Sequence, residues 1–176
     1  METTKNKLDP SVRIFLKNLS AYLNTKLYFY GSVQRNDYIL NESDIDIDIF
    51  TDNVESTILK LSHYLHVPKS KFKKTFSVTY KDDIYKYKTI GYKIYYTSPD
   101  LISPIEFCIY NEKDKEETLQ LHREKFNIPF YISWMLIFIK FLFYTLNIIP
   151  LSIYREIKNW LLSQCSETKK LHVTIF

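Results

Sequence analysis

The most informative residues of the chain form two short extended segments, LYFYGS at residues 27–32 and SDIDID at residues 43–48. In the second segment acidic and aliphatic residues alternate strictly, which is the period-two pattern of a β-strand. Side chains two residues apart share one face of a strand, so Asp44 and Asp46 are expected to project together. Two carboxylates held that close repel each other unless a cation lies between them. The pattern therefore predicts a site for a hard divalent cation with oxygen ligands, Mg²⁺ above all.

Gly31 directly follows the first segment, and it is one of only two glycines in the chain. Glycine permits a tight turn and a close approach of the backbone to a ligand. With Ser32 after it, the turn is expected to offer backbone N–H groups to a phosphate at a point where a helix can begin. The two segments together predict a phosphate site beside the cation site.

Gly31-Ser32, a spacer and Asp44-Ile45-Asp46 together resemble the signature of the DNA polymerase β-like nucleotidyltransferase superfamily. The spacer, with Arg35 and the bulky Tyr38-Ile39, is most similar to the branch of archaeal-type CCA-adding enzymes, poly(A) polymerases and oligoadenylate synthases. The resemblance covers residues 12–162. It implies a small mixed β-sheet of the polymerase β-like palm type, flanked by helices, and transfer of a nucleoside monophosphate from an NTP to a hydroxyl.

The resemblance also assigns residues that the spacing alone would not single out. The family places a third acid on a later strand, and Glu106 in Ile105–Ile109 is the best match. It places a triphosphate-binding lysine on a following helix, which matches Lys140, and a Ser/Tyr pair beyond it, which matches Ser152 and Tyr154. Tyr154 would stack on the nucleobase.

The implied mechanism is nucleotidyl transfer assisted by two Mg²⁺ ions, for which Mn²⁺ could substitute. Asp44, Asp46 and Glu106 would be the catalytic and metal-binding residues; one ion lowers the pKa of the acceptor hydroxyl while the other steadies the pyrophosphate. The NTP, with ATP favoured, would be bound by Gly31, Ser32, Arg35, Lys140, Ser152 and Tyr154. The acceptor is expected to be a nucleic-acid 3′ end or another nucleotide, but small stand-alone members of the superfamily also modify proteins or small molecules, so those acceptors stay open.

Three features differ from the family pattern. Asn36-Asp37 stand where relatives often have Gly-Thr, the third acid is Glu rather than Asp, and Asp48 adds an acid to the strand face. Asp48 is either a further ligand or a side chain that projects into solvent. The chain also leaves no room for the tail domain of tRNA-processing relatives. These departures keep open a second interpretation, a catalytically silent relative that acts as a binding or regulatory subunit.

The order of expected elements predicts an α+β fold. Helices are expected at 12–23 and 54–65, strands at 26–30, 44–50 and 105–110, two strands within 71–97 joined by a turn at Asp82-Asp83, and helices from 116 to about 163. We expect a nucleotidyltransferase core at residues 1–115. A helical part at residues 116–176 would pack on the core and complete the nucleotide cleft.

Composition excludes several classes of protein. Hydrophobic residues at 45% and charged residues at 25% argue against intrinsic disorder. Cys108 and Cys165 cannot form a disulfide framework or a cysteine zinc site. The N-terminus lacks the apolar stretch of a signal peptide, so a cytoplasmic location is expected. Scarce Gly and Ala beside abundant Lys, Ile, Tyr, Phe and Asn indicate an AT-rich genome, such as that of a large DNA virus, a parasite or a plasmid. For a virus, the expected location is the host cytoplasm.

Two further segments each have two interpretations. Residues 128–149 are apolar enough to span a bilayer, but Ser133, Lys140, Tyr144 and Asn147 fall in one stripe of a helix, which favours a buried helix lining a phosphate cleft. A membrane anchor is the less favoured interpretation. The Lys- and Tyr-rich residues 69–96 could contact an RNA or DNA acceptor, or could be a solvated hairpin.

Overall fold

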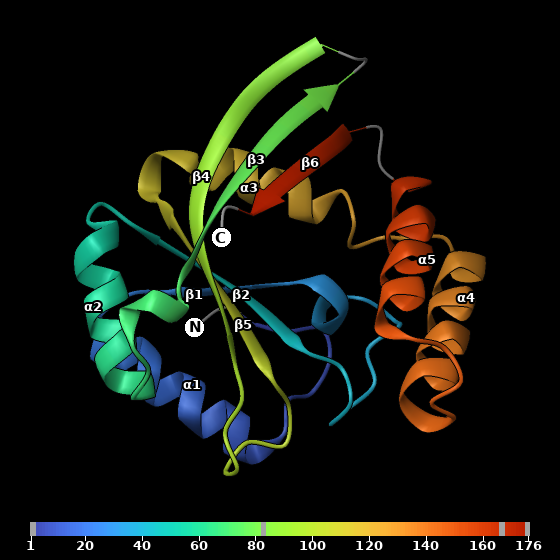
Figure 1. The fold of residues 1–176 in the computed structure, drawn as a ribbon, viewed down its shortest axis with the longest axis horizontal. Coiled ribbons are helices and arrows are strands. Elements are labelled where there is room, and N and C mark those ends of the chain that lie inside the picture. Colours follow the sequence, from blue (N-terminus) through green and yellow to red (C-terminus); the bar gives the residue numbers. More distant parts are fainter. Residues whose placement is uncertain (1–2, 82–83, 166–167, 175–176) are drawn as a thin grey trace.

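The computed structural model describes residues 3–81, 84–165 and 168–174, which fold around a six-stranded mixed sheet (Figure 1). The strand order is β1-β2-β5-β4-β3-β6, with β2 and β5 parallel and every other neighbouring pair antiparallel. The strands are β1 (Leu27–Tyr30), β2 (Ile45–Thr51), β3 (Lys73–Lys81), β4 (Ile84–Tyr96), β5 (Ile105–Asn111) and β6 (Thr168–Thr174). The α+β class and the mixed sheet predicted from the sequence are confirmed.

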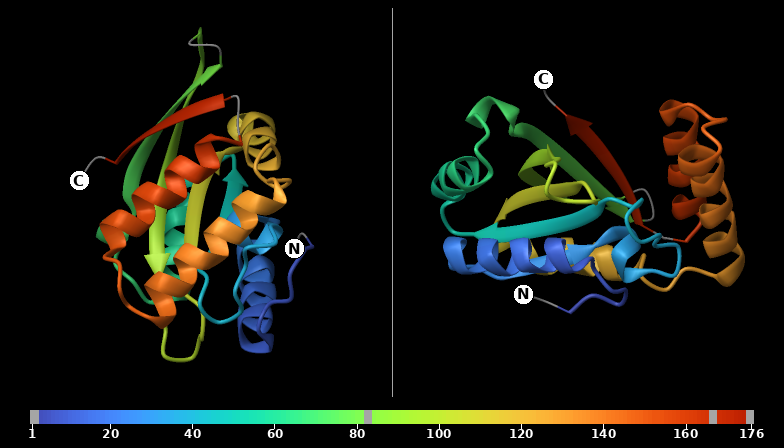
Figure 2. Two further views of the ribbon diagram at one scale, coloured as in Figure 1. Left: turned by 90° about the vertical axis from the view of Figure 1, so that its right-hand side faces the viewer. Right: turned by 90° about the horizontal axis from the view of Figure 1, so that it is seen from below.

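Helices cover the two faces of the sheet unequally (Figures 1 and 2). They are α1 (Pro10–Leu23), α2 (Val54–Leu65), α3 (Lys115–Arg123), α4 (Phe130–Lys140) and α5 (Leu151–Ser163). Leucines of α1 and α2 form the main core with Ile45, Ile47 and Ile49 of β2, which are fully buried. Because side chains alternate along a strand, the acids between these isoleucines face the other side of the sheet. That opposite face carries the candidate site.

The N-terminal helices begin and end as local sequence dictates. Asp9 caps α1, where its Oδ1 accepts a hydrogen bond from the Ser11 backbone N–H at 2.9 Å. Asn53 caps α2 by accepting from the Ser56 N–H. Asn24 and His66 end the two helices in the left-handed conformation. Both helices therefore lie close to where their periodicity predicts them.

The long hairpin of β3 and β4 extends past the other strands (Figure 1). The predicted turn at Asp82-Asp83 lies outside the described residues, but the two strands that flank it pair antiparallel, with a register shift between Thr79 and Tyr80. The strand β6 pairs antiparallel with β3, at the far side from β4. The part predicted as helical, residues 116–176, thus also contains a strand of the main sheet.

Helices α4 and α5 form a separate pair at one end of the molecule (Figure 2). They share a small core of their own, built from Ile132, Leu136 and Ile139 of α4 with Tyr154 and Leu161 of α5. A π-turn, η4 (Phe141–Thr145), follows α4 directly. The described part of the chain holds no helix with the length and apolarity needed to cross a membrane.

The expectation that residues 128–149 form one buried helix is wrong. The segment is broken at the π-turn, and only one side of α4 packs inward, with Ser133 and Lys140 on it. The opposite side of α4 is exposed, as Trp134 and Phe138 illustrate. Ser133 and Lys140 of the predicted polar stripe are therefore buried as expected, whereas Asn147, the last residue of the stripe, is exposed.

Candidate active site

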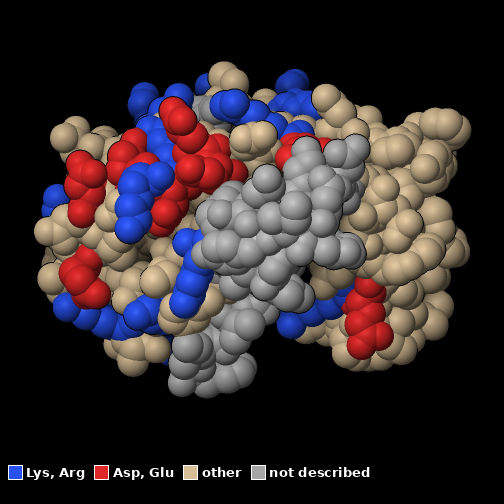
Figure 3. Space-filling model, turned by 90° about the horizontal axis from the view of Figure 1, so that it is seen from above, with Lys and Arg blue, Asp and Glu red and all other residues tan. Residues whose placement is uncertain are grey.

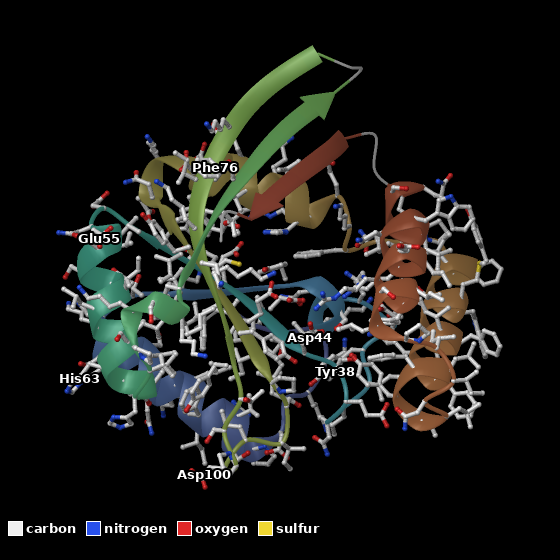
Figure 4. The ribbon with its side chains drawn as sticks, viewed as in Figure 1. Tyr38, Asp44, Glu55, His63, Phe76 and Asp100 are labelled. Carbon is white, nitrogen blue, oxygen red and sulfur yellow. The ribbon has the colours of Figure 1, made fainter. Side chains whose placement is uncertain are left out.

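The three acids predicted to be catalytic come from neighbouring strands of the open sheet face. Asp44 immediately precedes β2, and Asp46 lies on β2 opposite Glu106 of the parallel strand β5. Asp46 is also paired with Tyr30 on the other side, in β1. Asp44 lies at the end of β2 that faces α5 (Figure 4). The sheet register thus brings together acids that are 60 residues apart in the chain.

The surroundings of Asp46 disfavour a negative charge on its carboxyl group. Burial, then Asp44 and Glu106, raise the pKa of the Asp46 carboxyl well above its usual value. Lys158 and Lys93 act in the opposite direction but do not outweigh these effects. A buried carboxylate with acidic neighbours favours a bound cation.

Glu106 is held by groups of the protein itself. Its Oε2 lies 2.6 Å from Nζ of Lys93, on β4, and the Tyr30 hydroxyl donates to its Oε1 at 3.4 Å. Burial alone would lower the pKa of Lys93, but the Glu106 carboxylate raises it above its usual value. Lys93 is therefore a charged ammonium group beside the third acid.

Gly31 is required by the close approach of Asp46. The backbone of Gly31 is left-handed, with φ of +70°, and a Cβ there would lie 1.9 Å from Asp46 Oδ2. The residue opens the 3-10 helix η1 (Gly31–Gln34), as expected for a turn that starts a helix. Ser32 is buried, and its Oγ has no hydrogen-bond partner among the described residues. An unpaired buried hydroxyl next to this turn is a ready donor for a ligand oxygen.

A pocket of about 190 Å³ opens beside this turn. It is lined by Tyr30, Gly31, Ser32, Arg35, Asp46, Leu121, His122, Lys125, Phe126, Lys158 and Leu162. Arg35, Lys125 and Lys158 give it three cationic side chains around the one carboxylate of Asp46. Burial and then Arg35 lower the pKa of Lys125, which indicates cations held near one another. The pocket is suited to a polyanion such as a triphosphate.

Sequence reasoning missed Lys125 and Lys158. Lys158 lies one helical turn after Tyr154 in α5, and its Nζ is 5.9 Å from the centre of the Tyr154 ring. That spacing of four residues was a usable signal once Tyr154 had been singled out. Lys125 follows α3 in a segment with no distinctive pattern, so only the fold reveals it.

Arg35 and Lys140 meet at a buried carboxylate rather than at a shared phosphate. Arg35 Nε donates to Asp37 Oδ1 at 2.7 Å, and Lys140 Nζ lies 3.1 Å from Asp37 Oδ2. Lys140 also donates to Ser43 Oγ at 3.0 Å. All four residues are at least nine-tenths buried. Arg35 lines the pocket, whereas Lys140 ties α4 to the loop that carries Asp37.

The predicted Ser/Tyr pair also lies away from the pocket lining. Ser152 is exposed, at the start of α5. Tyr154 is buried, and its ring stacks on Phe143 at 4.6 Å between ring centres, with 11° between the planes. In this arrangement the Tyr154 ring lies close to Lys158 and is buried, so it is not open to a nucleobase.

Asp48 does not project into solvent, so that interpretation is wrong. Its carboxylate is 1% exposed, and its Oδ2 lies 2.8 Å from Nε2 of His122 on α3. Tyr30 stacks on the His122 ring at 4.0 Å between ring centres. Tyr30 therefore connects His122 on one side with Glu106 on the other. Asp48 attaches α3 to the sheet beside the pocket.

A second hollow, of about 430 Å³, is lined in part by Lys93, the partner of Glu106. Lys71, Lys73 and Lys93 line it together with Tyr95, whose side chain is exposed. Tyr95 is opposite Glu106 in the β4–β5 register, and burial together with Asp44 and Glu106 raises its pKa. This groove belongs to the predicted Lys- and Tyr-rich segment and leads to the acids.

The donor set suits a hard divalent cation, because Asp44, Asp46 and Glu106 offer carboxylate oxygens. The raised pKa of Asp46 supports such a ligand. Within residues 3–81, 84–165 and 168–174, however, no three His, Cys or acidic side chains are grouped as a metal site. A cation bound to Glu106 would have to compete with Lys93.

Comparison with protein families gives one match. A family model described as a nucleotidyltransferase domain matches residues 12–131, which is more than half of the chain. The match includes β1, β2 and β5, the strands that carry the glycine turn and the acids. No curated protein and no solved structure matches the chain.

Proposed function

The chain belongs to the nucleotidyltransferase domain family, and from this premise we propose that it transfers a nucleoside monophosphate from an NTP, with ATP favoured, to a hydroxyl group. One observation carries the proposal. Asp46 and Glu106 lie opposite each other on β2 and β5, and Asp44 directly precedes β2, beside a glycine turn and a pocket with three cationic side chains. Binding a triphosphate next to carboxylates is the arrangement that this reaction needs.

Asp44, Asp46 and Glu106 would hold Mg²⁺ or Mn²⁺ in this proposal. Bound there, the divalent cation would supply charge neutralisation at the phosphates and a lowered pKa for the acceptor hydroxyl. Arg35, Lys125 and Lys158 bind the triphosphate oxygens. We assign them this role in place of Lys140, because all three line the pocket, whereas Lys140 does not line it and is engaged by Asp37 and Ser43.

The proposed transfer step forms one bond to the α-phosphorus and breaks another. The acceptor hydroxyl oxygen attacks the α-phosphorus, the bond from that phosphorus to the bridging oxygen breaks, and pyrophosphate leaves. Glu106 accepts the hydroxyl proton on a carboxylate oxygen, and Arg35 and Lys158 stabilise the negative charge that develops on pyrophosphate. The Ser32 hydroxyl donates to a phosphate oxygen beside the Gly31 turn.

The acceptor in this proposal is a nucleic-acid 3′ end. The groove lined by Lys71, Lys73 and Lys93 gives a cationic path for a phosphate backbone, and the exposed Tyr95 gives a face on which a base can stack. Because Tyr95 is opposite Glu106, a base stacked on it would bring the terminal hydroxyl toward the acids. We place the reaction in the cytoplasm, in keeping with two free cysteines.

A second candidate function is a nucleotide-binding subunit without transferase activity. The observation that favours it is the ion pair of Lys93 with Glu106, which neutralises the third acid. Such a protein would keep the triphosphate pocket and would use Lys93 where an active relative uses a bound cation.

The decisive experiment measures transfer from α-³²P-labelled NTPs to RNA, DNA, nucleotide and protein acceptors in Mg²⁺ or Mn²⁺. The double variant Asp44→Asn/Asp46→Asn is expected to lose transfer while staying folded. Asp52→Asn is the matched control, because Asp52 is an exposed acid just beyond the same strand. NTP binding without transfer by the wild-type protein would favour the silent subunit. A folded protein that binds no NTP would contradict both candidates.

A further inference from the structure

The outer side of α4 is a large apolar surface with no partner in the described residues. Phe130, Trp134 and Phe138 are 77%, 71% and 59% exposed, and they recur every four residues along one side of the helix. Tyr131, Met135 and Phe141 are also at least 44% exposed. We call these six residues the α4 face.

The inner side of α4 is apolar as well, because Ile132, Leu136 and Ile139 pack against α5. A helix that is apolar all round is normally enclosed on both sides. Figure 2 shows α4 and α5 side by side as the outermost layer at this end of the molecule. The α4 face therefore exposes what would ordinarily be an interior surface.

The area of the α4 face matches one half of a protein interface. A fully buried aromatic side chain covers about 150–250 Å², so the exposed fractions of the six side chains leave roughly 700 Å² of mostly apolar surface. Exposed apolar patches on monomeric proteins rarely exceed a few hundred Å². A stable dimer of standard size buries about 800 Å² on each partner.

The scarcity of charged residues in and around α4 indicates the kind of partner. Between Lys125 and Arg155 the sequence has one charged residue, Lys140, and it is buried. The end of the molecule that holds α4 and α5, at the right in Figure 3, is mostly uncharged, with charged side chains confined to its lower edge in this view. A two-fold contact places the same patch on both partners, so a patch without charges brings no like charges together. Phe, Tyr, Trp and Met are also the residues enriched in the centres of protein interfaces.

A lipid surface fits these observations less well. Helices that lie on membranes have a basic polar side opposite their apolar side. The opposite side of α4 is packed on α5, and its single basic residue, Lys140, is buried. We propose that the α4 face is the dimer interface of this protein, and that a second copy of the chain covers it through a two-fold contact of α4 with α4.

The test is sedimentation equilibrium of the full chain up to about 100 µM, because interfaces of this size have dissociation constants from micromolar downward. We expect a dimer, and we expect Trp134→Glu/Phe138→Glu to weaken it at least about 100-fold, because buried aromatic residues dominate interface energy. Circular dichroism should show the variant folded, since both side chains are exposed. Ile14→Glu is the control: Ile14 is 62% exposed on α1, and its substitution should leave the dimer intact.

A second measurement locates the contact directly. A nitroxide label on Met135→Cys should give a short distance between the two copies by double electron–electron resonance, whereas a label on Ile14→Cys should not. A monomer at the highest concentration overturns the proposal, as does a dimer that survives the glutamate pair. Binding of the wild-type monomer to phosphatidylcholine vesicles, lost in the glutamate variant, would assign the α4 face to lipid and overturn it too.

Discussion

Lys93 Nζ lies 2.6 Å from Glu106 Oε2, so the third acid of the site is already paired with a cation of the protein. The two residues come from neighbouring strands, β4 and β5, and the Lys93 side chain is 41% exposed. Lys93 also lines the groove with Lys71 and Lys73, while Glu106 is opposite Asp46, which lines the pocket. A ligand or cation that binds this Glu106 oxygen must therefore displace Lys93 from it.

Removing Lys93 should strengthen metal binding. In Lys93→Met the Glu106 carboxylate loses its internal partner and a like charge leaves the cation site, so Mn²⁺ affinity should rise at least about fivefold. Titration followed by electron paramagnetic resonance of free Mn²⁺ measures the change. Lys71→Met, at the edge of the same groove, is the control and should leave the affinity as it is. Weaker Mn²⁺ binding by Lys93→Met would mean that Lys93 supports the site instead of competing for it.

Replacement of Lys140 should lower the stability of the protein and leave its affinity for NTP unchanged. Replacing it with Met removes one partner of the buried Asp37 and should lower the free energy of unfolding by about 3 kcal/mol. Thermal melting would then show a Tm lower by roughly 10 °C. NTP affinity of the folded variant should be unchanged. A normal Tm together with lost NTP binding would return Lys140 to the triphosphate role that the sequence suggested.

Lys158 and Lys125 should carry the affinity for triphosphate. Each of Lys158→Gln and Lys125→Gln is expected to weaken the binding of inorganic tripolyphosphate about tenfold, since each removes a charge-assisted hydrogen bond. Isothermal titration calorimetry measures both. The exposed Lys60 of α2 provides the control variant, Lys60→Gln. Equal affinity in all three variants would show that the pocket does not hold the phosphates.

The buried Asp37 should make stability depend on pH in the acid range. Burial alone would raise the pKa of Asp37, but Arg35 and Lys140 lower it below its usual 3.8. A carboxyl whose pKa is lowered by folding stabilises fully above its unfolded pKa, and this contribution disappears as the pH falls through the folded value. Urea unfolding of wild type and Asp37→Asn should therefore differ by a constant amount near neutral pH and converge below about pH 4. A difference that persists undiminished in acid would rule out the charged pair as its source.

The Gly31 turn and Asp46 should be energetically coupled. Gly31→Ala places a Cβ into Asp46 Oδ2 and also strains a left-handed backbone, so it should cost more than about 2 kcal/mol of unfolding free energy. In an Asp46→Ala background the clash with the carboxyl group is gone, although the backbone strain and a 3.2 Å contact with the Cβ of residue 46 remain, and the cost should fall to about 1 kcal/mol. Urea denaturation of the four proteins completes the cycle. Additive effects would mean that the two side chains are not in contact.

Local sequence was sufficient for the parts of the site that lie on β1 and β2. The alternation of acids and isoleucines identified β2 and its buried face, and the rarity of glycine drew attention to Gly31. The superfamily predicted from these residues is confirmed by the family match, while its branch stays a prediction. Asp46 and Glu106 required one further step, since their pairing depends on a parallel register between distant strands.

The remaining site residues depend on packing that local patterns do not encode. Lys140 meets Asp37 across 103 residues of chain, and nothing near either residue indicates that they will pair. The same holds for Asp48. The alternating strand pattern does not decide whether its side chain faces solvent or contacts another residue, and the structure places it against His122. Tyr154 was assigned to the nucleotide by resemblance, but the stacking of Phe143 on it follows from the π-turn after α4. These contacts depend on how α3, α4 and α5 pack against the sheet and against each other.

The return of the chain to the sheet through β6 has a mechanical consequence. The α4–α5 pair is anchored before its midpoint by the Lys140–Asp37 contact and after its end by the pairing of β6 with β3. A segment fixed at both ends can shift or bend slightly, but it cannot swing outward as a hinged flap. If the pocket binds a triphosphate as proposed, we expect the α4–α5 pair to stay in place while the side chains of Lys125 and Lys158 adjust to the ligand.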